Sequence, residues 1–114
     1  MAGASLNLLQ GTLDLVVLKA VMFGPRHGYE VARWVRDTTD GALTVDDGAL
    51  YTALHRLLKR GWLKADWGVT EQNRRAKYYA LTPSGRRQLA AEAKSWERYA
   101  EAIFKVLSAT ADAA

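Results

Sequence analysis

Apolar residues recur at helical spacing through the first half of the chain, and this pattern predicts three helices. The first is expected from about Thr12 to Phe23 and the second from His27 to about Thr38. The third begins around Gly48 and ends before Gly61, because glycine is common at the position that directly follows a helix. Because the first helix is apolar nearly all round, it must be covered on both sides. One domain of this length covers one side easily, so we expect a partner chain to cover the other.

The second and third helices each have an apolar inner side and a polar outer side. We expect the inner side of the second helix to consist of Tyr29, Val31, Ala32 and Val35. At the start of the third helix, either Asp46 or Asp47 can accept a hydrogen bond from a free N–H group of the first turn. Its apolar stripe consists of Leu50, Leu54, Leu57 and Leu58. The opposite side offers an aromatic ring, a hydroxyl, an imidazole and an amine, from Tyr51, Thr52, His55 and Lys59.

Alternation with period two predicts two strands, Trp62–Trp67 and Lys77–Leu81, joined by a polar link. Thr82 and Pro83 then suit the N-cap and the first position of a last helix that runs to about Ser108. Apolar residues along this helix are spaced by three and four in turn, which is typical of a coiled-coil seam. We expect the seam to pair with a second copy of the chain through Leu89, Ala93, Trp96, Ala100, Ile103 and Leu107.

Together these elements predict a mainly α fold with a small β-hairpin. The order of helix, hairpin and helix is that of a winged helix-turn-helix, here followed by a C-terminal dimerisation helix. With 114 residues the chain is expected to be one compact unit. Residues 1–82 would form the winged helix-turn-helix that binds DNA, and residues 83–114 would form the dimerisation helix.

Positive charge is concentrated in the middle of the chain. The net charge is only +4, but nine of the 16 basic residues lie between Tyr51 and Gln88, opposed by two acidic residues. A local basic surface is typical of a protein that binds a polyanion. An exposed helix side is usually just solvated, but a basic hairpin directly after it favours DNA contact. The candidate DNA-binding residues are Tyr51, Thr52, His55 and Arg56 on the third helix and Asn73, Arg74, Arg75 and Lys77 on the hairpin. The two aspartates at the helix start place carboxylates where a phosphate would approach, so we expect capping to be their main role.

Other classes of function find little support. The chain has no cysteine and two histidines, which makes a metal site improbable, and no cofactor is expected. Neither histidine has an evident catalytic partner, and no phosphate-binding loop or nucleophile motif is present, so we expect no enzyme. The most apolar run, Leu13–Phe23, has 11 residues, too few to cross a membrane. With no secretory signal visible at the start, the chain is expected to be cytoplasmic.

Several segments, taken in order, resemble the PadR family of bacterial transcriptional regulators over nearly the whole chain. They are QGTLD at 10–14, GPRHGYE at 24–30, GALYTALHRL at 48–57, RGW at 60–62 and RRAKYYALTPSG at 74–85. The resemblance implies a winged helix-turn-helix, dimerisation through the C-terminal helix, and repression relieved by a small molecule. The short C-terminal helix is similar to that of the compact subfamily. Ala49 stands where the family often has Ser or Thr, and Thr52 stands where it often has Pro. These departures put the base contacts of this helix in question.

The resulting hypothesis is a homodimeric repressor whose two recognition helices contact a pseudo-palindromic DNA operator, with half-sites about one helical turn apart. Trp96 has two interpretations. A tryptophan in a helix seam is usually a packing residue, but it also offers a flat wall for a planar aromatic effector at the dimer interface. Ser95-Trp96-x-Arg98 is similar to family members whose central tryptophans line a drug-binding pore. The alternative function is a winged-helix adaptor that binds partner proteins and no specific DNA.

Overall fold

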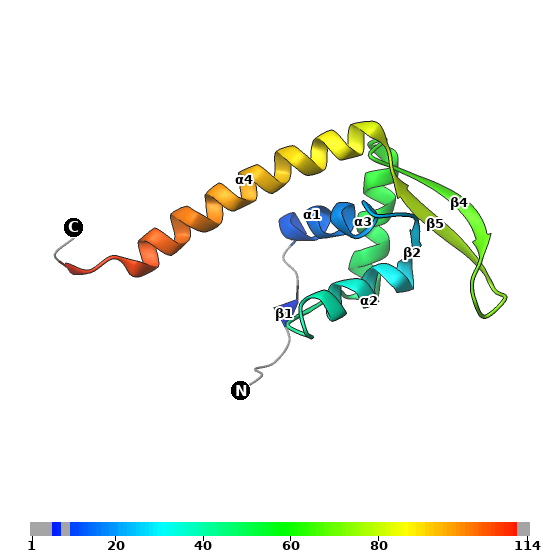
Figure 1. Cartoon of the computed structure of the whole chain (residues 1–114), viewed down its shortest axis with the longest axis horizontal. Coiled ribbons are helices and arrows are strands. Elements are labelled where there is room, and N and C mark those ends of the chain that lie inside the picture. Colours follow the sequence, from blue (N-terminus) through cyan, green and yellow to red (C-terminus); the bar gives the residue numbers. More distant parts are fainter. Residues whose placement is uncertain (1–5, 8–9, 112–114) are drawn as a thin grey trace.

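The computed structural model describes residues 6–7 and 10–111, and it contains four helices joined by short strands within these residues (Figure 1). The helices are α1 (Gln10–Ala20), α2 (Gly28–Thr38), α3 (Asp47–Lys59) and α4 (Pro83–Ser108). The strands are β1 (Leu6–Asn7), β2 (Arg26–His27), β3 (Leu43–Thr44), β4 (Leu63–Val69) and β5 (Arg75–Leu81). The predicted class, mainly α with a small sheet, is confirmed.

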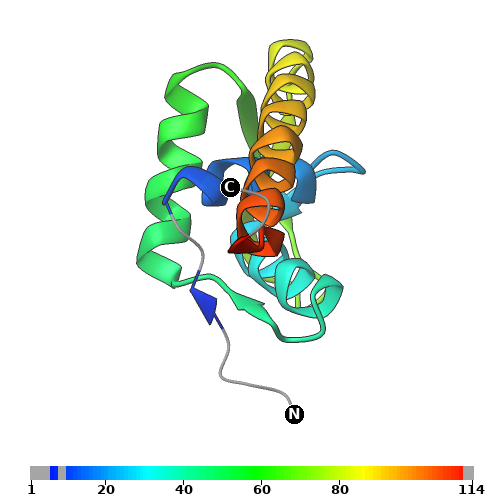
Figure 2. The same cartoon turned by 90° about the vertical axis from the view of Figure 1, so that its left-hand side faces the viewer.

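Helix α1 lies at the centre of the molecule and contacts α2, α3 and α4 (Figures 1 and 2). Its side chains Val17, Leu18 and Ala20 are completely buried. The first half of α4 folds back over α1 and covers part of it. Leu15 and Val16 remain half-buried along an apolar groove, so the expectation that a partner chain covers this side stays a prediction.

Local sequence signals set the ends of α3 as predicted. Asp46 is the N-cap, and its Oδ2 accepts a hydrogen bond from the Ala49 N–H at 3.0 Å. Gly61 follows the helix with a φ of +76°, a backbone conformation that favours glycine. Its N–H donates to the carbonyl of Leu58 and the Trp62 N–H donates to that of Leu57, which is the Schellman arrangement. The leucine stripe is buried except for Leu58, which is half-buried.

The hairpin is longer than predicted and belongs to a three-stranded antiparallel sheet in the order β2-β5-β4. In β2, Arg26 pairs with Tyr79 and His27 with Tyr78, so the start of α2 is joined to the hairpin. A strand of two residues has no alternation to reveal it in the sequence. The second small sheet pairs β1 with β3 in parallel.

Two predicted inner residues lie elsewhere. Tyr29 was expected on the inner side of α2, but its side chain is 64% exposed because it lies in the first turn, beyond the core that Val31 and Val35 enter. Leu89 was expected in the dimerisation seam, but it is only 6% exposed and belongs to the core of its own chain. The periodic pattern of α4 continues across the point where the helix leaves the core, so the pattern could not separate these two roles.

The base of α4 is joined to the end of α3. The hydroxyl of Thr82 donates to the carbonyl of Gly61 at 2.7 Å, and the hydroxyl of Ser84 donates to the same carbonyl at 3.0 Å. Gly85 lies so close that a Cβ atom there would be 2.1 Å from the carbonyl oxygen of Trp62. From this base α4 extends past the other helices, and residues 101–111 are all exposed (Figure 1).

Candidate nucleic-acid interface

The polar side of α3 is exposed as predicted, at Tyr51, Thr52 and His55. The ring of Tyr51 packs over the first residue of α2, since a Cβ atom on Gly28 would lie 2.7 Å from the Tyr51 hydroxyl oxygen. Helices α2 and α3 therefore meet closely at the end that carries the exposed side chains. The carboxylate of Asp46 is used in capping, and Asp47 follows as the first helical residue.

Arg56 has a different place from the other predicted α3 residues. Its guanidinium forms two hydrogen bonds with the carboxylate of Asp14 on α1, one of them between Nε and Oδ2 at 3.2 Å. The side chains of Arg56 and Asp14 are 25% and 15% exposed. The hydrogen bond to Asp14 raises the pKa of Arg56 above its ordinary value. This pair braces α3 against α1, and Arg56 is thus engaged within the protein.

The hairpin of β4 and β5 projects from the body of the molecule as a wing (Figure 1). Its tip is a three-residue loop closed by the Thr70 N–H, which donates to the carbonyl of Arg74 at 2.8 Å. Asn73 has a φ of +61° there, a conformation that asparagine tolerates better than most residues. The tip thus places Arg74 and Arg75 at the end of the wing, where both are exposed.

Strand register decides which face of the wing carries the cations. Trp67 pairs with Lys77, and Ala65 pairs with Tyr79. Residues directly opposite one another share a face, and alternate residues along a strand share it too. The face that buries Tyr79 in the core therefore continues outward as Trp67, Lys77 and Arg75.

This face of the wing, the start of α2 and Tyr51 of α3 line one open hollow of about 640 Å³. Tyr29, Tyr51 and Trp67 contribute aromatic rings to its wall, and Arg74, Arg75 and Lys77 contribute positive charge. The structure thus brings Tyr51 together with the predicted wing cations. Tyr29 and Trp67 were not among the predicted site residues, because Tyr29 was expected on the inner side of α2 and Trp67 was assigned only to a strand.

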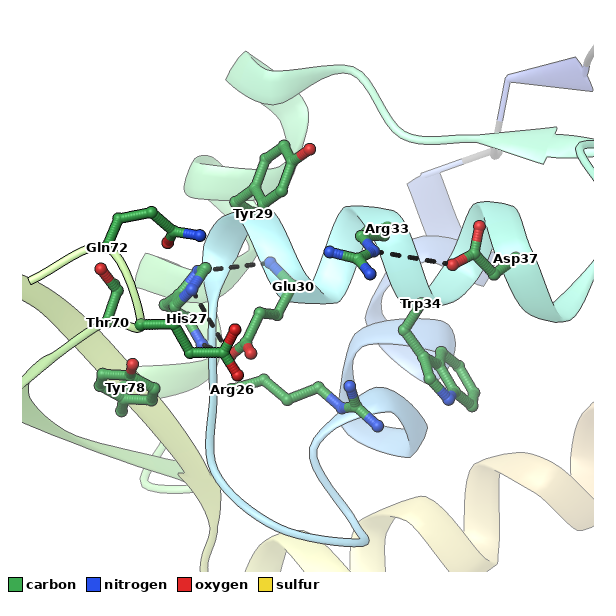
Figure 3. A pocket seen from close by; sticks show the side chains of 11 residues that line it. Arg26, His27, Tyr29, Glu30, Arg33, Trp34, Asp37, Thr70, Gln72 and Tyr78 are labelled. Carbon is green, nitrogen blue, oxygen red and sulfur yellow. Dashed lines mark hydrogen bonds and ion pairs between the residues drawn. The ribbon is translucent and has the colours of Figure 1, made fainter. Parts of the chain in front are cut away.

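A second contact joins α2 to the wing on the other face of the hairpin (Figure 3). His27 caps α2, its Nδ1 accepting from the Glu30 N–H at 3.3 Å, while Glu30 accepts from the His27 N–H. The imidazole lies edge-on to the ring of Tyr78, with centroids 5.4 Å apart. Helix α2, helix α3 and the wing are thus held as one surface.

Trp96 lies on α4, 45% exposed, at a largely apolar groove of about 630 Å³ between α1, α2 and α4. Trp34, Leu89 and Ala93 also line this groove. Among the described residues, no group of three or more metal-ligating side chains is found. In the same part of the chain, no helix is long and apolar enough to cross a membrane.

A helical core, a recognition-type helix and a hairpin directly after it define a winged-helix DNA-binding fold. The chain belongs to the PadR-like family of transcriptional regulators, whose family model matches residues 17–91. The predicted family and fold are confirmed, and the protein is a transcriptional regulator rather than an enzyme.

Solved structures agree with this assignment. A transcriptional regulator from Clostridium thermocellum is 31% identical, with a TM-score of 0.76, over 84% of this chain and 90% of that one. A PadR-like transcriptional regulator from Bacillus cereus is 22% identical, with a TM-score of 0.76, over 90% of this chain and 97% of that one, a likeness of fold. Among curated proteins, an uncharacterised protein from Lysinibacillus sphaericus is 27% identical over 97 residues, which cover 85% of this chain and 89% of that protein.

Proposed function

We propose that the chain is a homodimeric repressor, active in the cytoplasm, that binds a pseudo-palindromic DNA operator and is released by a small-molecule effector. Residues 1–82 bind DNA and residues 83–114 form the dimer. The observation that carries the DNA-binding proposal is the open hollow in which Tyr51, on the exposed side of α3, meets the cationic face of the wing. An α-helix fits the major groove, and cations on a wing beside it reach the flanking phosphates or the minor groove.

Within this proposal Tyr51, Thr52 and His55 contact base edges or nearby phosphates, and Asn73, Arg74, Arg75 and Lys77 contact the backbone. Arg56 was also a candidate, but its two hydrogen bonds to Asp14 support a structural role, so we leave it out of the interface.

The wing is tested by a DNA-binding titration at several salt concentrations. Arg74→Ala with Arg75→Ala should weaken binding to all duplexes and reduce the slope of log K against log salt by about 2 per protomer, or about 4 for the bound dimer. A matched control, Lys94→Ala with Arg98→Ala, removes the same charge from exposed positions of α4 and should leave the slope nearly unchanged. An unchanged affinity and slope for the wing variant would refute the wing contact. Weak, salt-insensitive binding by the unmodified protein would instead favour a protein-binding adaptor.

Dimerisation is supported by the outer part of α4, where the exposed fractions of large apolar side chains are high. Ile103 is 40% exposed, Phe104 67% and Leu107 74%. With Leu89 used in the core, the proposed seam runs through Ala93, Trp96, Ala100, Ile103 and Leu107. Sedimentation equilibrium at micromolar concentration should give the mass of a dimer, and Ile103→Lys with Leu107→Lys should give a monomer. Glu101→Lys, on the same helix, is the control. A monomer mass for the unmodified protein would refute the proposal.

An effector site at Trp96 is supported by the groove beside it, because its volume is in the range of small-molecule pockets. We propose a planar aromatic ligand that stacks on Trp96. Tryptophan fluorescence should be quenched by such a ligand, and Trp96→Phe should reduce the quench. Trp34 lines the same groove and should account for the quench that remains, whereas Trp62 and Trp67 should be unaffected. Fluorescence that ignores a panel of planar aromatics and cations would contradict the ligand.

A further inference from the structure

Trp67 occupies an unusual place for a tryptophan. It lies on the core-facing side of β4, but beyond the point where the core ends, and its side chain is 62% exposed. It therefore contributes little to the buried core of the chain. A large ring left in solvent on a projecting wing calls for another physical explanation.

The neighbours of Trp67 supply one. The guanidinium carbon of Arg75 lies 4.7 Å from the centroid of the indole, and the Nζ of Lys77 lies 5.8 Å from it. Both distances are within the range of a cation–π interaction, and tryptophan is the strongest partner among the aromatic residues. Lys77 is directly opposite Trp67 in the sheet, and Arg75 is one diagonal step away. One ring therefore holds two cations on the face that lines the hollow.

Cationic side chains whose conformations are already restricted bind phosphate better than flexible ones. Arg and Lys side chains have many rotamers, and fixing them on binding costs conformational entropy. Two positive groups on adjacent same-face positions also repel one another, which drives unsupported side chains apart. A ring that both of them contact fixes both in advance without cancelling their charge, unlike a carboxylate.

We propose that Trp67 is a positioning residue for DNA binding, which acts on DNA through Arg75 and Lys77 rather than by touching it. This inference rests on the proposed DNA-binding function. Loss of the ring should therefore weaken binding while leaving the number of phosphate-neutralising charges unchanged. The salt dependence, which counts those charges, separates this role from that of the cations themselves.

The first test needs no DNA. In the free protein, ring-current shifts should move the side-chain methylene protons of Arg75 and Lys77 upfield, and Trp67→Ala should abolish the shifts. Methylene shifts that are the same with and without the indole would overturn the inference. Circular dichroism and a thermal scan of the variant check that the fold is kept, as the exposure of Trp67 leads us to expect.

The second test is a double-mutant cycle with a mixed-sequence duplex about three helical turns long. Trp67→Ala should weaken binding about three- to tenfold with an unchanged salt slope, and Trp67→Phe should recover part of the loss. In a background of Arg75→Ala with Lys77→Ala, the same Trp67→Ala change should have no further effect. Val69→Ala is the control, because Val69 shares the face and is equally exposed, at 62%; it should bind like the unmodified protein.

The other outcomes are decisive. If Trp67→Ala weakens DNA binding just as much in the Arg75→Ala, Lys77→Ala background, the indole contacts DNA itself. If Val69→Ala weakens binding as much as Trp67→Ala does, the apolar face of the wing is responsible. Either result overturns the inference while DNA binding stands. If the unmodified protein binds no duplex, the proposed function fails and this inference fails with it, although the ring-current shifts would remain.

Discussion

The contact between Gly85 and Trp62 predicts a large effect from a single added methyl group. A Cβ atom at position 85 would lie 2.1 Å from the carbonyl oxygen and 2.9 Å from the carbonyl carbon of Trp62, so these atoms would have to retreat by about 1 Å. That carbonyl also accepts the N–H of Thr82 at 3.1 Å, so its retreat weakens a hydrogen bond at the base of α4. Overpacking costs about 1–3 kcal/mol and the weakened hydrogen bond about 1 kcal/mol, against a gain of up to about 1 kcal/mol for replacing a helical glycine.

The expected net loss for Gly85→Ala is therefore about 1–3 kcal/mol of unfolding free energy, which is about 5–15 °C in Tm for a domain of this size. Urea and thermal unfolding followed by circular dichroism would measure it, at one fixed protein concentration because association would shift the transition. Gly11→Ala is a matched control, for which we expect a change in stability of the opposite sign. Gly11 lies in α1 with no atom within 4 Å of an added Cβ, so this variant should be stabilised by about 0.5 kcal/mol. A Gly85→Ala protein as stable as the parent would refute the close seating of α4 on Trp62.

Three further predictions concern single side chains. Asp14→Ala leaves the half-buried guanidinium of Arg56 unpaired and should cost about 2 kcal/mol of unfolding free energy in urea. Asp14→Leu with Arg56→Leu should recover much of this loss. A loss in the double variant equal to the sum of the two single losses would contradict the pairing. Asp46→Ala removes the N-cap of α3 and should cost about 1 kcal/mol, with Asp47→Ala as the milder control. Burial raises the pKa of Tyr79 above its ordinary value of 10.0, with a smaller contribution from Tyr51. The folded state therefore holds this proton more tightly, and stability should fall as pH rises above 10.0. Tyr79→Phe should flatten that fall, and equal slopes in both proteins would refute the assignment.

Local signals in the sequence were sufficient for the ends of α3, the start of α4 and the existence of the wing. They were not sufficient for the first helix, which was predicted from about Thr12 to Phe23 and spans Gln10–Ala20. Asp46, Gly61 and Thr82 each act on the backbone within a few residues, so their chemistry can be read without the rest of the fold. The structural partner of Arg56 could not be predicted, for the opposite reason. Its partner Asp14 lies 42 positions away, and only the packing of α1 against α3 brings the two together.

Periodic patterns also could not show where the core ends. The alternation of β4 predicts which face Trp67 shares, but not that the strand outruns the core at that point. The same is true of α4, in which one periodic stripe serves the core at Leu89 and is exposed at Ile103 and Leu107. The point at which α4 leaves the core depends on its packing against α1, which lies elsewhere in the chain.

The hydrogen bonds that join the base of α4 to the end of α3 have a mechanical consequence. A helix of 26 residues is about 39 Å long at 1.5 Å per residue. The N-terminal end of α4 is fixed to α3 and continuous with β5. The helix therefore moves as a rigid arm together with the recognition helix and the wing. If the outer ends of two such helices are held together, a tilt of about 10° displaces each base, at the opposite end, by about 7 Å. In a dimer held at those outer ends, small changes in the crossing angle would therefore alter the distance between the two recognition helices, and with it the operator spacing that fits.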